Sequence, residues 1–117
     1  HTVTTNERFP ADMMAVDIGP KTTALFASKL EGAATVFWNG PVGVFEITPF
    51  NRGTEQIGKA VASSNAYSVV GGGDSVAALR KGGLVPFISH VSTGGGASLQ
   101  FLRGSPLPGI KALGEEQ

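Results

Sequence analysis

The sequence predicts an α/β fold, in which a parallel β-sheet carries helices on both faces. Short apolar runs typical of strands alternate along the chain with segments whose apolar residues recur at helical spacing. Such alternation implies right-handed crossovers between parallel strands. Continuous apolar runs such as Tyr67–Val70 indicate strands that are buried on both faces. We therefore expect a three-layer αβα, Rossmann-like arrangement.

Two strands and one helix are expected in the first third of the chain. Residues 1–12 are polar and irregular, which is typical of a loop or a frayed end. Met13–Ile18 is an apolar run, interrupted by Asp17, that predicts the first strand. Apolar residues at helical spacing predict a helix over Lys21–Leu30. The β-branched and aromatic run Thr35–Trp38 predicts the second strand.

Three more helices and two more strands follow. Thr54–Ala62 gathers its apolar residues on one face and predicts a helix. Tyr67–Val70 and Pro86–Val91 predict strands, and each leads into a segment with helical spacing, Val76–Arg80 and Leu99–Arg103. Four strands make a thin sheet for this fold class, so we expect an incomplete lobe.

Composition limits the classes of protein that are possible. The 117 residues make at most one ordinary domain, and nine Lys+Arg balance nine Asp+Glu. The arginines are scattered, so no basic face predicts nucleic-acid binding. Because cysteine is absent, disulfides, zinc–thiolate sites and thiol nucleophiles are excluded. No apolar stretch approaches the roughly 18 residues that a membrane span requires. The chain begins at His1 rather than Met, which leads us to expect a fragment or a processed piece.

Two glycine clusters carry the strongest functional signal. Gly71–Ser75 and Ser92–Ser98 each follow an expected strand and open an expected helix. Glycines at such a turn let the backbone approach a ligand closely, and the first amides of the helix have no internal partner. These amides and the positive end of the helix dipole favour an anion, above all phosphate. Two such turns in succession predict a polyphosphate ligand.

Asp74 is the distinctive residue of the first cluster, which matches neither a Walker loop nor the dinucleotide fingerprint. As a structural residue, Asp74 would cap the helix. As a functional residue, it would hold Mg²⁺, directly or through water, beside a phosphate that is seated on Gly72, Gly73 and Ser75. Both interpretations stay open at this point.

The second cluster contains no charged side chain. Thr93–Gly96 can bind a ligand only through amides, a hydroxyl and the helix dipole. Such a preorganised cradle suits charge that develops in a transition state. The alternative is a tight turn that requires positive φ. His90 precedes the cluster, and because a lone histidine beside a strand end is more often structural than a base, we assign it no catalytic role.

A third constellation follows the second expected strand, over residues 37–46. A Gly-Pro pair turns the chain over an apolar ledge formed by Val42, Val44 and Phe45. An adenine ring could lie on that ledge, with Glu46 accepting hydrogen bonds from the ribose hydroxyls. The alternative is that the aromatic residues belong to the core and the carboxylate is simply exposed.

Six segments closely resemble phosphoglycerate kinase, in that family's order and spacing. They cover the chain from about Pro10 to Leu113. The segments are Asp17–Thr22, Trp38–Glu46, Phe50 with Gly53 and Thr54, Val70–Asp74, Ser89–Ser98 and Leu107–Gly109. Any one of them could arise by chance, whereas all six together are highly specific.

The resemblance implies a cytoplasmic, glycolytic enzyme with two lobes that transfers a phosphoryl group from 1,3-bisphosphoglycerate to MgADP. Residues 1–113 would form the later part of its C-terminal, nucleotide-binding lobe, and residues 105–117 would begin the tail that returns to the other lobe. The whole enzyme would be a monomer whose partners are ADP or ATP and phosphoglycerate, without nucleic acid or membrane. A non-catalytic nucleotide-binding module and a docking piece completed by another chain are the alternatives.

The resemblance also implies roles for individual residues. The residues around the adenine would be Ala15, Val16, Pro41, Gly43 and Val44. The residues that bind the ribose and the phosphates would be Glu46, Asn39, Gly72, Gly73, Asp74 and Ser75, with Asp74 facing Mg²⁺. The residues that stabilise the transferring phosphoryl group would be Gly73, Gly94, Gly95 and Gly96. Ala15 stands where the family pattern has glycine, and Ser75 where threonine is commoner.

Two parts of the family's machinery have no counterpart in this sequence. The acid substrate would bind a basic patch on the other lobe, and the phosphate-binding lysines of the nucleotide lobe precede this segment. Lys21, Lys29 and Lys59 do not match the motif of those lysines. Because phosphoryl transfer depends mainly on positioning and charge stabilisation, we expect the chain alone to show no measurable kinase turnover.

Overall fold

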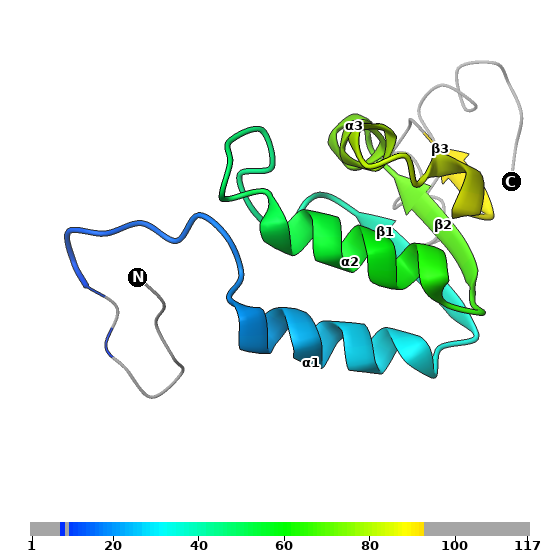
Figure 1. Ribbon diagram of the computed structural model, residues 1–117, viewed down its shortest axis with the longest axis horizontal. Coiled ribbons are helices and arrows are strands. Elements are labelled where there is room, and N and C mark those ends of the chain that lie inside the picture. Colours follow the sequence, from blue (N-terminus) through cyan, green and yellow to red (C-terminus); the bar gives the residue numbers. More distant parts are fainter. Residues whose placement is uncertain (1–7, 9, 93–117) are drawn as a thin grey trace, which may run out of the picture.

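The structure, a computed structural model, describes Arg8 and residues 10–92, and there it contains three α-helices and a parallel sheet (Figure 1). The elements in chain order are α1 (Pro20–Glu31), β1 (Thr35–Asn39), α2 (Arg52–Ser63), β2 (Tyr67–Gly71), α3 (Gly73–Lys81), a 3₁₀ turn η1 (Val85–Phe87) and β3 (His90–Ser92). The expected α/β class is confirmed.

The three strands are parallel and lie in the order β1-β2-β3. β1 pairs with β2 up to Asn39 opposite Gly71, and β2 pairs with β3 up to Gly71 opposite Ser92. The carboxyl ends of all three strands therefore meet at one edge. Ligands of open parallel sheets bind at this edge.

The hydrophobic core lies on one face of the sheet, beneath α2 and α3. Its main side chains, each at most 8% exposed, are Val36, Trp38, Ile57, Val61, Val70 and Leu79. Leu30 of α1 packs against the same cluster, and α1 lies beside α2 (Figure 1). On the opposite face Phe37 and Val69 are only half-buried and Tyr67 is exposed. Within residues 10–92, the helices thus cover one face of the sheet.

The glycine turn after β2 is itself the start of a helix. The sequence predicts helical spacing only from Val76, whereas α3 begins at Gly73 and has Gly72 as its N-cap. The first unpaired amides of the helix therefore belong to the glycine cluster, at the sheet edge where ligands bind. In the part of the chain that the structure describes, no helix is both long enough and apolar enough to cross a bilayer.

The prediction of a strand over Met13–Ile18 is wrong. This segment is irregular, and Met14 is 77% exposed. Its polar groups bind a loop and a helix end rather than a neighbouring strand: Val16 O accepts a hydrogen bond from Val44 N at 2.8 Å, and Asp17 binds backbone amides. An apolar run indicates burial, but it does not supply the pairing partner that a strand requires.

The strand expected over Pro86–Val91 is shorter than predicted. Val85–Phe87 forms the 3₁₀ turn η1, and β3 begins only at His90. Proline has no N–H for a sheet ladder, so Pro86 suits the first turn of a helix better. The helix expected over Leu99–Arg103 lies outside the described residues.

Candidate functional site

The turn after β2 meets the end of β1 at the carboxyl edge of the sheet. Gly72 has φ 96°, a region that favours glycine. A Cβ on Gly72 would lie 2.8 Å from Asn39 Oδ1, so the backbone of the turn passes directly against this side chain. The structure therefore brings together two residues that were predicted to bind phosphates.

Asp74 lies in the first turn of α3 and is exposed. No side chain caps this helix, and the Asp74 carboxylate makes no hydrogen bond or ion pair with another described residue. The capping interpretation therefore has no support in this structure. The described residues contain no group of three or more metal-ligating side chains. Asp74 fits Mg²⁺ only where phosphate oxygens and water complete the coordination, which is the usual arrangement for this ion.

Ser75 occupies an unexpected position. It is fully buried, and its Oγ accepts a hydrogen bond from Gly40 N at 2.7 Å. The carbonyl oxygen of Gly40 accepts a second hydrogen bond, from Trp38 Nε1 at 2.6 Å. Both backbone polar atoms of Gly40 are thus held by side chains. The hydroxyl of Ser75 joins the turn after β1 to α3 and does not line an open site.

The loop after β1 brings the residues predicted around the adenine together. Val44 N donates to Val16 O at 2.8 Å, which joins this loop to the segment before α1. Val42 N donates to Thr54 Oγ1 of α2 at 3.2 Å. Glu46, predicted to bind ribose, is exposed in the middle of the same loop.

The remaining predicted residues of the adenine group lie around this contact. Ala15 is exposed beside Val16, and Pro41 and Gly43 flank Val42 and are half-buried. The structure therefore gathers the whole group within two segments, one before α1 and one after β1.

Sequence reasoning missed Asp17, whose carboxylate binds two chain segments. Its Oδ2 accepts a hydrogen bond from Gly53 N at 2.8 Å, and its Oδ1 accepts one from Ile18 N at 2.8 Å. A Cβ on Gly43 would lie 2.5 Å from Asp17 Oδ1, and one on Gly53 would collide with the same atom. The N-cap residue of α2, Asn51, forms no capping bond, so Asp17 caps this helix from a distance. The signals in the sequence were a carboxylate within an apolar run and its place at the start of the segment Asp17–Thr22.

The second glycine cluster begins where the described chain ends. Gly94, Gly95 and Gly96 lie outside the described residues. β3 ends at Ser92, whose carbonyl oxygen accepts a hydrogen bond from Gly72 N at 3.0 Å. The chain therefore enters the second cluster directly beside the first.

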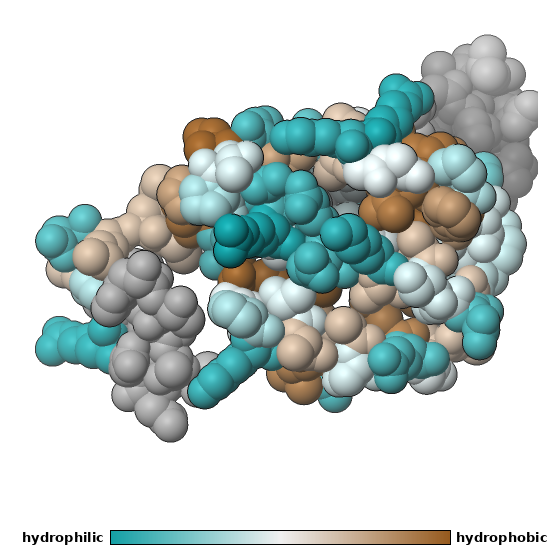
Figure 2. All heavy atoms as spheres, in the orientation of Figure 1, coloured by the Kyte–Doolittle hydropathy of each residue, from teal (hydrophilic) through white to brown (hydrophobic). Residues whose placement is uncertain are grey.

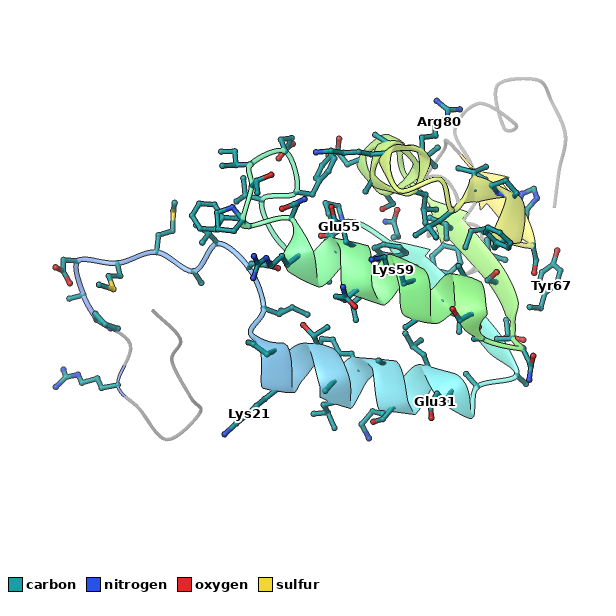
Figure 3. All side chains as sticks on the ribbon, in the orientation of Figure 1. Lys21, Glu31, Glu55, Lys59, Tyr67 and Arg80 are labelled. Carbon is teal, nitrogen blue, oxygen red and sulfur yellow. The ribbon has the colours of Figure 1, made fainter. Side chains whose placement is uncertain are left out.

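A cavity of about 250 Å³ lies between α2 and α3. Its lining consists of Trp38, Thr54, Glu55, Gly58, Lys59, Ala78, Leu79, Gly82 and Leu84. Glu55 and Lys59 project from the same side of α2 in Figure 3, and hydrophilic side chains gather over this helix in Figure 2. None of the predicted site residues lines the cavity.

Comparisons with known proteins decide the family. The family model described as phosphoglycerate kinase matches residues 1–105. This chain belongs to the phosphoglycerate kinase family. Over 114 residues it is 55% identical to the phosphoglycerate kinase of Koribacter versatilis, a match that covers 97% of this chain and 28% of that protein. Over 105 residues it is 58% identical to the phosphoglycerate kinase of Thermus thermophilus, covering 89% of this chain and 27% of that protein.

Solved structures of phosphoglycerate kinases share this fold. The enzyme from Coxiella burnetii superimposes with a TM-score of 0.75 at 54% identity, over 84% of this chain and 25% of that one. The enzyme from Pyrococcus horikoshii gives the same TM-score of 0.75 at 46% identity, over 84% of this chain and 24% of that one. The chain thus spans between 24% and 28% of the length of these relatives.

Proposed function

We propose that this chain supplies the nucleotide-binding site of a phosphoglycerate kinase, which transfers a phosphoryl group between 1,3-bisphosphoglycerate and MgADP. The observation that carries this proposal is the close approach of the Gly72 turn to Asn39 at the carboxyl edge of the sheet. Membership of the family supplies the substrate class, and this approach supplies the place in the chain where a polyphosphate fits.

The phosphates would lie at the N-terminus of α3. The first amides of this helix, from Gly73 to Ser75, have no acceptor within the helix and point along its dipole toward the ligand. Asn39 adds a side-chain amide at the same edge. Asp74 and the phosphate oxygens would hold Mg²⁺ between them, and the ion would supply positive charge against the phosphates.

The base would lie between the two segments that Val16 and Val44 join. Both residues are half-buried, so their apolar side chains offer a partly dry surface to a ring. Glu46 is exposed, and its carboxylate would accept hydrogen bonds from the ribose hydroxyls. Gly94–Gly96 would complete the site as the cradle of the transferring group.

We expect this chain to bind the nucleotide without catalysing phosphoryl transfer. The site holds the nucleotide, whereas the acid substrate and the phosphate-binding lysines belong to parts of the family pattern that the sequence does not match. In a coupled assay of ADP formation, we expect no turnover above background. A rate of ADP formation like that of a whole phosphoglycerate kinase would contradict the assignment of the acid-substrate site and the phosphate-binding lysines to parts that this sequence does not match.

Nucleotide binding is expected to stabilise the fold. MgADP at 100 times its Kd should add about 2.7 kcal/mol to the free energy of unfolding, measured as a thermal shift. Asp74→Ala should weaken MgADP binding by about tenfold, because a carboxylate next to the ion is lost, and should have little effect in EDTA. Asp12→Ala, which removes an exposed carboxylate outside the site, is the matched control.

Two outcomes would contradict the proposal. A folded chain that MgADP does not stabilise has no formed nucleotide site. A loss of affinity for Asp74→Ala that is equal with Mg²⁺ and with EDTA would show that this carboxylate acts on the helix rather than on the metal.

A further inference from the structure

We infer that Ser75 is a positioning residue. Its buried hydroxyl couples the part of the proposed site that binds the phosphates, at the start of α3, to the part that binds the adenine, around Val16 and Val44. The inference rests on the proposed function and deepens it. The resemblance assigns Ser75 to direct contact with the nucleotide, whereas the structure gives its hydroxyl a different partner. That partner is the backbone of the loop that leads to the adenine group.

The hydrogen bond from Gly40 N to Ser75 Oγ joins residues 35 positions apart. Ser75 is 0% exposed, so no solvent competes for this acceptor. Within residues 10–92, it is the hydrogen bond that connects the loop after β1 to α3. If Ser75 Oγ were lost, the amide N–H of Gly40 would have no hydrogen-bond partner.

The other side of Gly40 is held just as firmly. Trp38 Nε1 donates to Gly40 O at 2.6 Å, and the indole of Trp38 is part of the core beneath α2 and α3. Gly40 has φ 97°, a conformation that favours glycine. Two hydrogen bonds at opposite ends of one residue fix the direction in which the chain leaves β1.

Alternate amides of this loop are bound by different elements. The N–H groups of Gly40, Val42 and Val44 bind α3, α2 and the segment before α1, in that order. Thr54 Oγ1, which holds the middle amide, is 2% exposed and therefore equally protected. Three residues of the same loop separate Gly40 from Val44, and along them a displacement at Ser75 would reach Val44. The hydroxyl of Ser75, beside the phosphate-binding turn, thus sets the position of the adenine-binding part of the loop around Val44.

This role predicts a pattern that a phosphate ligand would not produce. In Ser75→Ala, Gly40 N loses its acceptor, and amide hydrogen exchange at Gly40 should rise by about tenfold. Exchange at Val44 should rise with it. Affinity for MgADP should fall by about tenfold, while affinity for magnesium tripolyphosphate, which has no base, should stay unchanged. Ser75→Thr keeps the hydroxyl and should restore both readouts.

The experiment compares the wild-type chain with these variants by exchange in nuclear magnetic resonance and by calorimetric titration of both ligands. Ser28→Ala is the matched control, because that hydroxyl is exposed and donates only to Leu25 O of its own helix. If Ser75→Ala does not fold, Ser75→Cys provides the same test, since a thiol is a weaker acceptor.

Three results would overturn the inference. Unchanged exchange at Val44 in Ser75→Ala would show that the loop does not transmit the displacement. Equal losses for MgADP and tripolyphosphate would make Ser75 a direct phosphate ligand. Failure of Ser75→Thr to restore exchange would rule out the hydroxyl as the cause. If the wild-type chain bound neither ligand, the proposed function would fail, and the exchange data would still decide the role of Ser75.

Discussion

Gly53→Ala is expected to lower the free energy of unfolding by about 3 kcal/mol. The new Cβ would collide with Asp17 Oδ1 and lie 2.7 Å from Ile18 Cγ1. The carboxylate cannot move away without cost, because Gly53 N and Ile18 N both donate to it. Either α2 shifts away or its only long-range cap is lost. Urea denaturation monitored by the fluorescence of Trp38 measures the effect.

A substitution at a second glycine separates crowding from the intrinsic effect of alanine. Gly32→Ala is the control, because a Cβ there meets nothing within 4 Å and the residue has φ −93°. We expect its stability to stay within about 0.5 kcal/mol of wild type. The variant Asp17→Ala is itself destabilised, but in that background Gly53→Ala should cost much less than in wild type, since only the contact with Ile18 Cγ1 remains. Additive losses in the double variant would contradict the contact between Asp17 and Gly53.

The interactions that escaped prediction are long-range hydrogen bonds. Trp38 and the glycine turn at Gly72 are marked by local signals: an aromatic residue in an apolar run, and glycines between a strand and a helix. Asp17 and Ser75, by contrast, bind backbone amides 36 and 35 positions away. No periodicity of the sequence encodes such a pair, because the partner is an amide that every residue except proline carries.

Gly43 and Gly53 are likewise explained only by a contact with a distant segment. Gly43 lies in a segment that the sequence interprets as an adenine ledge, and Gly53 lies at the start of an expected helix. The structure shows that each is small because the carboxylate of Asp17 occupies the space where a Cβ would lie. The requirement for glycine is therefore set by a third segment. The resemblance to a family located these positions, and only the contacts explain them.

Gly72→Ala is expected to affect both stability and binding. Alanine at φ 96° is strained, and its Cβ would lie 2.8 Å from Asn39 Oδ1, so we expect a loss of about 2 kcal/mol in the free energy of unfolding. Relief of this strain would turn the first amides of α3 away from the edge of the sheet. Affinity for MgADP should consequently fall by about tenfold or more. Denaturant unfolding and calorimetric titration measure the two effects.

Variants of Gly73 and Asn39 separate the two causes of the loss at Gly72, which are the strained backbone and the contact with Asn39. Gly73→Ala places a Cβ that meets nothing within 4 Å, at a position without positive φ, so its stability should equal or exceed that of wild type. In an Asn39→Ala background, Gly72→Ala should recover the part of the loss that the contact causes and keep the part that the backbone causes. Equal stability of the Gly72→Ala and Gly73→Ala chains would contradict the left-handed turn. The positive φ of Gly72 would then not be what aims the amides of α3 at a phosphate.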